Sequence, residues 1–65
     1  MINTERLGEL MSEKGMSQRD LSNELGVTEQ MVHYILYGKK IPSLAVYTDM
    51  CRVLGVSMDE LVKEG

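Results

Sequence analysis

The sequence has few residues suited to covalent bracing or membrane insertion. It contains one cysteine, Cys51, which excludes an internal disulfide and favours a reducing setting. The opening MINTERLGEL lacks the basic segment and the apolar run of a secretory signal. No stretch approaches the ~20 apolar residues that span a bilayer. We therefore expect a cytoplasmic protein with no membrane association.

Aromatic residues and proline are also scarce. With no Trp or Phe and only three Tyr, the core must consist mostly of Leu, Val, Ile and Met. Pro42 is the single proline, and no linker or low-complexity stretch interrupts the chain. A chain of 65 residues buries only ~60% of the surface that it exposes when unfolded. The sequence therefore predicts one small domain over residues 1–65, or one domain cut from a longer protein.

Groups that carry catalysis or bind metals are few. One histidine, His33, and one cysteine, Cys51, lie far apart without companions, so no metal site is expected. Cys51 falls within an apolar stripe, which favours a small core residue over a nucleophile. The sequence contains no Ser–His–Asp spacing, phosphate-binding loop or nucleotide fingerprint. We accordingly expect no enzymatic activity, no catalytic residue and no cofactor.

Positive charge is limited as well. The net charge of −3 argues against a non-specific nucleic-acid binder, because such a domain is usually strongly basic. It does not exclude a binder whose few cations lie on one face. In residues 17–40 three cations balance three carboxylates; these are Arg19, Lys39, Lys40, Asp20, Glu24 and Glu29. The acidity therefore lies outside this segment.

The sequence does show helical periodicity. Apolar residues recur at 3.6-residue spacing, and no alternating β pattern appears. Ser17, Thr28, Ser43 and Ser57 stand where N-caps are expected, and Ser57 with Glu60 has the spacing of a full capping box. The residues expected to face inward are Leu7, Leu10, Met11, Val32, Ile35, Leu36, Leu44, Tyr47, Met50, Cys51 and Leu54. The sequence thus predicts an all-α fold, a compact bundle of five short helices.

Two near-identical tetrads, LGVT at 25–28 and LGVS at 54–57, join consecutive helices. Each provides a last core residue, a C-cap glycine, a staple residue and an N-cap hydroxyl. The first tetrad, LGVT, forms a tight turn around Gly26 between two helices, which is the arrangement of a helix-turn-helix. The second leads into the last expected helix, near Met58 to Lys63.

The segment GMSQRDLSNELGVTEQMVHYILYGKKIPSL resembles the helix-turn-helix of the lambda-repressor-like (Cro/repressor, XRE-type) DNA-binding domains. The similarity continues through VLGVSMDEL and covers the chain from about Leu7 to Leu61. It implies a single helix-turn-helix DNA-binding domain with the motif at about 17–37. One departure is that Met11 and Leu36 stand where many family members carry an Arg–Glu ion pair. Both partners are replaced together, so neither charge is left buried without its partner.

The resemblance also implies which residues contact DNA. In a helix-turn-helix the N-terminal part of the second helix enters the major groove. By resemblance, Glu29, Gln30, His33 and Tyr34 occupy positions that face base edges. The positions expected along the DNA backbone are Gln18, Thr28, Lys39 and Lys40, with Thr28 also capping the helix.

Glu29 and His33 each have two interpretations. A carboxylate in the first turn of a helix is favourable by ~0.3–1 kcal/mol, so Glu29 either stabilises the helix start and points to water or accepts from cytosine N4. In the second case Gln30 would pair with adenine N6 and N7. His33 either contacts a base or phosphate or simply faces solvent.

The predicted function is a sequence-specific, repressor-like transcriptional regulator that occupies a double-stranded DNA operator. With so few cations, one copy should bind weakly, so a homodimer on a palindromic site is expected. The residues expected to leave apolar surface for that dimer are Ile41, Val53, Met58 and Val62. The alternative is a protein-interaction module, such as an antitoxin or anti-repressor partner, since fold alone does not fix function.

Overall fold

The computed structural model describes residues 2–62 and shows four α-helices followed by a short 3-10 helix. In chain order the elements are α1 (Thr4–Glu13), α2 (Gln18–Leu25), α3 (Glu29–Leu36), α4 (Leu44–Leu54) and the 3-10 helix η1 (Met58–Leu61). Within the described residues, β-type pairing is confined to one isolated bridge between Ile2 and Val62. The all-helical class is therefore confirmed, whereas the fifth α-helix is replaced by a single 3-10 turn.

The last element differs from its prediction in two respects: it is a 3-10 turn, and the expected capping box does not form. Ser57 precedes η1 but makes no side-chain capping bond. The Glu60 carboxylate instead accepts hydrogen bonds from Arg6, from Nη2 at 2.9 Å and from Nε at 3.1 Å. Both bonds tie the Glu60 side chain to α1, and the Glu60 N–H group donates to the Ser57 carbonyl at 3.2 Å, as in a 3-10 turn. Lys63, at the expected end of this helix, lies outside the described residues.

The other predicted caps form as local chemistry dictates. Ser17 and Asp20 make a reciprocal capping box, with bonds of 3.1 and 3.0 Å between each side chain and the other residue's N–H group. Thr28 Oγ1 accepts the Met31 N–H at the start of α3. Ser43 caps α4 in the same way. Each of these bonds spans three residues, so sequence spacing alone suffices to predict it.

The core gathers apolar side chains from all five elements. Its buried members are Leu7, Leu10, Met11, Leu21, Val32, Ile35, Met50, Cys51, Leu54 and Leu61. The free Cys51 is therefore a core residue, as predicted. Leu36 is half-buried and packs against this core. Met11 and Leu36, which stand where many family members carry an ion pair, therefore both make apolar contacts in the interior.

Leu44 corrects the predicted inner face of α4, because 71% of its surface is exposed. It is the first residue of α4, and Val46 and Tyr47 after it are only half-buried. The first turn of α4 therefore projects beyond the core, and full burial begins at Met50. Periodicity identified the face correctly but could not show where the core ends.

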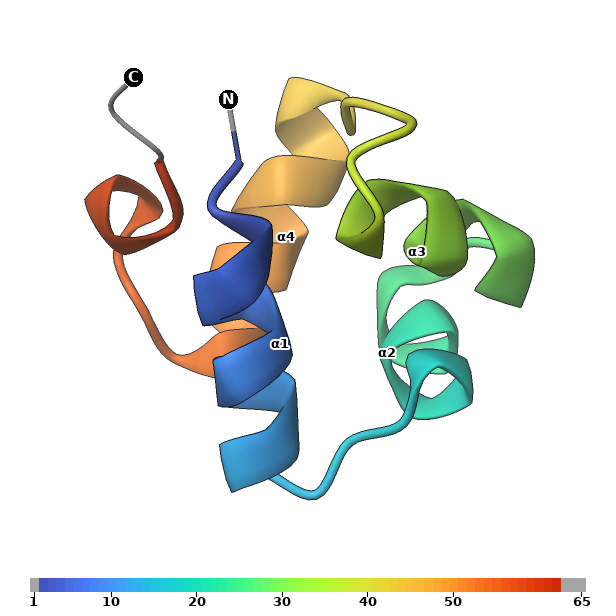
Figure 1. Ribbon diagram of the computed structural model, residues 1–65, viewed down its shortest axis with the longest axis horizontal. Coiled ribbons are helices and arrows are strands. Elements are labelled where there is room, and N and C mark those ends of the chain that lie inside the picture. Colours follow the sequence, from blue (N-terminus) through green and yellow to red (C-terminus); the bar gives the residue numbers. More distant parts are fainter. Residues whose placement is uncertain (1, 63–65) are drawn as a thin grey trace.

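The arrangement places α2 and α3 together on one side of the molecule. Figure 1 shows α1 and α4 in the centre, with α2 and α3 on one side of them and η1 on the other. The two ends of the described chain meet, because the Asn3 N–H group donates to the Leu61 carbonyl at 2.7 Å. In residues 2–62 no helix has the length and apolar character needed to cross a membrane.

Candidate nucleic-acid interface

The turn between α2 and α3 is fixed by backbone geometry at Gly26. This residue ends α2 with a φ of 69°, in the left-handed region that glycine adopts without steric cost. The N–H groups of Gly26 and Val27 both donate to the Ser22 carbonyl. Thr28 follows immediately as the N-cap of α3. Two residues therefore separate the cap glycine of one helix from the first residue of the next.

The helix α3 has one buried face and one exposed polar face. Val32 and Ile35 are buried and anchor it in the core. Among the residues predicted to face bases, Glu29, Gln30 and His33 are exposed and Tyr34 is 37% exposed. Because the inner face is held by packing, the polar face is presented on a fixed support rather than on a loop.

Hydrogen bonding and ring contacts link the side chains of this polar face. Gln30 Nε2 donates to Tyr34 Oη at 2.9 Å, one helical turn away. The ring centroids of His33 and Tyr37 lie 4.5 Å apart at an interplanar angle of 45°. Tyr37 itself is largely exposed. The structure thus joins Gln30 to Tyr34 and places His33 beside an aromatic ring.

Glu29 lies beside a cation that the sequence did not single out. Its Oε1 is 3.6 Å from Arg19 Nε, and the two side chains are 58% and 80% exposed, respectively. Arg19 is the second residue of α2 and Glu29 the first of α3, so this pair spans the turn between the helices. Opposite charges at the starts of two consecutive helices were the signal available in the sequence.

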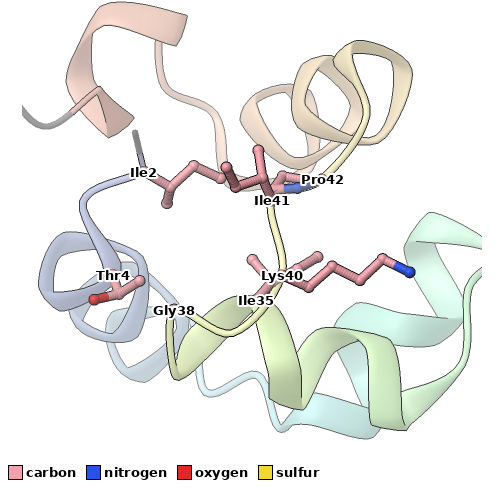
Figure 2. Close-up of a pocket in the computed structure, with 7 residues that line it drawn as sticks. All are labelled: Ile2, Thr4, Ile35, Gly38, Lys40, Ile41 and Pro42. Carbon is pink, nitrogen blue, oxygen red and sulfur yellow. The ribbon is translucent and has the colours of Figure 1, made fainter.

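The predicted backbone contacts lie at the edges of this face. Gln18 opens α2 and is half-buried, whereas Lys39 and Lys40 are exposed in the loop after α3. The N–H groups of both lysines donate to the Tyr34 carbonyl, at 2.8 and 3.3 Å. In Figure 2 the Lys40 side chain runs away from Ile2. The loop is therefore tied to the end of α3 while its cations stay exposed.

Comparison with known families decides what this helix pair is. A family model described as helix-turn-helix matches residues 7–61, which is most of the chain. The chain belongs to the lambda-repressor-like (XRE-type) helix-turn-helix family. The helices α2 and α3, joined by the tight turn at Gly26, have the arrangement of a helix-turn-helix.

A curated relative carries the same family name. This helix-turn-helix chain is 39% identical, over 59 residues, to the SPbeta prophage-derived uncharacterized HTH-type transcriptional regulator YonR of Bacillus subtilis (strain 168). The match covers 91% of this chain and 55% of the relative. The chain therefore spans about half the length of the curated relative that it matches.

Two ionisable groups away from the exposed face of α3, those of Cys51 and Tyr47, have structural roles. Burial raises the pKa of the Cys51 thiol, so this group is held neutral in the core. Burial likewise raises the pKa of Tyr47, whose hydroxyl donates to the Met58 carbonyl and links α4 to η1. Across residues 2–62, no three or more His, Cys, Asp or Glu side chains gather as potential metal ligands.

Proposed function

We propose that this helix-turn-helix chain is a sequence-specific, repressor-like transcriptional regulator in the cytoplasm, and that α3 reads the major groove of a double-stranded DNA operator. The observation that carries the proposal is the exposed polar face of α3, held in place by the buried Val32 and Ile35. A helix is narrow enough to enter the major groove, and amide side chains pair with base edges there. Gln30 is the principal reader, with Tyr34 and His33 beside it.

Glu29 has a supporting role beside these readers. Its exposed carboxylate is close enough to Arg19 to form an ion pair. A negative charge also suits the positive end of the α3 dipole. A contact between Glu29 and cytosine N4 requires the Glu29 carboxylate to leave Arg19. We therefore propose that Glu29 pairs with Arg19 in the free protein and contacts a base only after DNA has bound.

Phosphate contacts are assigned to residues at the borders of the face. Thr28 Oγ1 accepts the Met31 N–H at 3.1 Å, which leaves its own O–H proton available for a phosphate. Lys39 and Lys40 provide positive charge at the other end of α3. Gln18 adds an amide at the start of α2. With so few cations, the dependence of affinity on salt should be shallow.

A homodimer would double these contacts, and an exposed apolar surface supports it. Ile41 is 78% exposed and Leu44 71% exposed, and Val62 lies in the same region. Two adjoining depressions of about 160 and 200 Å³ share Ile2, Ile41 and Pro42 as lining residues. Figure 2 shows Ile2 and Ile41 directed toward each other. We propose this surface as the contact between two copies on a palindromic operator.

The residues expected to leave apolar surface agree with this assignment in part. Ile41, Met58 and Val62 are exposed, whereas Val53 is half-buried. Leu44, which was expected inside, adds to the exposed surface. Sedimentation that shows a monomer at high micromolar concentration, with and without DNA, would contradict the dimer.

The decisive test is selection of duplexes from a random-sequence library at low salt, with Gln30→Ala and Lys39→Ala beside the wild type. We expect an enriched palindrome. Gln30→Ala should relax preference at one base pair by ~1–3 kcal/mol, since only that pair loses its partner. Lys39→Ala should weaken binding to all sequences alike. Equal loss on every sequence for Gln30→Ala would contradict a reading role.

The acidic net charge of −3 favours a second candidate, a protein-interaction module such as an antitoxin or anti-repressor partner. In that case α3 would dock on protein rather than DNA. The same selection separates the two functions. No enriched sequence, together with a protein partner whose binding is lost in Gln30→Ala, would favour the module.

A further inference from the structure

The bond between Gln30 and Tyr34 leaves Gln30 with a defined set of free groups. The side-chain amide of glutamine has two N–H donors and one carbonyl oxygen. One N–H group is committed to Tyr34 Oη at 2.9 Å. The remaining N–H and Oε1 are one donor and one acceptor side by side. This pair matches the major-groove edge of adenine, which offers N7 as acceptor and N6–H as donor.

The direction of this bond decides which base Gln30 suits. A tyrosine hydroxyl both donates and accepts, so the amide could also turn over and accept the Tyr34 O–H proton through Oε1. Gln30 would then present two N–H donors, which match the O6 and N7 acceptors of guanine. Specificity therefore requires something that fixes where the Tyr34 proton goes.

A DNA phosphate would fix that proton, because its oxygens only accept. The Tyr34 side chain is 37% exposed, so its hydroxyl is open to such a partner. Its hydroxyl lies at Gln30, one helical turn nearer the start of α3, where Thr28 is the proposed phosphate contact. If Tyr34 donates to phosphate, its oxygen can only accept from Gln30, and Oε1 must face the base.

We infer that Tyr34 is a positioning residue that sets the Gln30 amide for adenine, through a hydrogen-bond chain from phosphate to Tyr34 to Gln30 to base. This inference rests on the proposed function and adds to it the residue that enforces the choice of adenine by Gln30. Tyr34 acts through its hydroxyl, not through its ring. Removing the oxygen alone should therefore change base preference while leaving the helix intact.

The test uses the duplex that the wild type selects from the random library. At the base pair where Gln30→Ala loses preference, duplexes carrying adenine, guanine or 7-deazaadenine are compared by fluorescence anisotropy. We expect the wild type to prefer adenine over guanine by about tenfold or more and to bind 7-deazaadenine, which lacks the N7 acceptor, more weakly. Tyr34→Phe should reduce the adenine preference to about threefold or less, because the amide is then free to turn over.

Tyr37→Phe is the matched control, since Tyr37 follows α3 directly as its C-cap and lies next to His33. It should keep the adenine preference of the wild type. Thermal unfolding of both variants checks that α3 stays folded. A Tyr34→Phe preference equal to that of the wild type, or a Gln30-dependent base pair other than adenine–thymine, would overturn the inference while leaving DNA reading intact. If no duplex is enriched at all, the proposed function fails and this inference fails with it.

Discussion

Replacing Glu29 with glutamine should slightly weaken the fold and strengthen non-specific DNA binding. The carboxylate lies 3.6 Å from Arg19, and both side chains are well exposed. Such pairs contribute ~0.2–1 kcal/mol, and a first-turn carboxylate gains ~0.3–1 kcal/mol from the helix dipole. We therefore expect a loss of about 1 kcal/mol, which corresponds to a fall in Tm of roughly 4–8 °C in a domain of this size.

The affinity of the Glu29→Gln variant for non-specific DNA should increase. Glu29→Gln removes one negative charge per subunit from the proposed interface and releases Arg19, whose side chain is 80% exposed, to contact a phosphate. Each added phosphate contact steepens the slope of log K against log salt by about 0.9. The assay is fluorescence anisotropy on an unselected duplex between about 50 and 200 mM salt.

Two further variants identify the cause. Glu24→Gln removes the same charge from α2 at a position exposed to solvent, and should leave the slope unchanged. In an Arg19→Gln background, Glu29→Gln should no longer steepen the salt slope, because the side chain that would contact the phosphate has been removed. A wild-type slope in Glu29→Gln, or an equal gain with and without Arg19, would refute the idea that Glu29 restrains Arg19.

Four other substitutions test the fold and the dimer. Gly26→Ala should destabilise the fold by about 1–2 kcal/mol, because an L-residue is strained at the φ of 69°. Gly8→Ala should stabilise the fold by about 0.5–1 kcal/mol, because glycine is unfavourable inside a helix such as α1. Urea unfolding measures both changes. Hydrogen bonds from the Ser17 N–H and hydroxyl groups lower the pKa of Asp20, so its contribution is present above the ordinary Asp pKa of about 3.9 and is lost as the pH falls through the lower folded value. Asp20→Asn should remove that part of the acid sensitivity of the urea midpoint. Leu44→Glu should leave monomer stability within about 0.5 kcal/mol but abolish dimers in sedimentation with operator DNA. A dimer that persists would rule out the surface around Leu44.

Helix starts were predictable because the chemistry is local. Ser17, Thr28 and Ser43 each bond the N–H group three residues ahead, and the sequence displays that spacing directly. The failed prediction at Ser57 has a different cause. Its partner Glu60 is taken by Arg6, which is 54 positions away in the sequence, and no local pattern shows that contact.

In the candidate site, too, local features could be predicted from the sequence, whereas contacts between helices could not. The exposed face of α3 follows from 3.6-residue periodicity, since burying Val32 and Ile35 leaves Gln30 and His33 outside. The ion pair of Glu29 with Arg19 depends on how two helices cross at the turn. A sequence reports which groups can interact along one helix, but packing decides which groups meet between helices.

Part of the acidity of the chain lies away from the proposed DNA-binding face. Arg6 lies within 3.3 Å of Glu9, Glu13 and Glu60, so these carboxylates concentrate where α1 meets η1. Figure 1 shows η1 on the side of α1 and α4 away from α2 and α3. Because salt weakens the interaction between exposed charges with a screening length of about 10 Å at 0.1 M, this acidity should repel DNA less than carboxylates on α3 itself would. Few cations remain to attract DNA either, so the proposed function requires its affinity to come from matched base edges and from two copies on one operator rather than from charge.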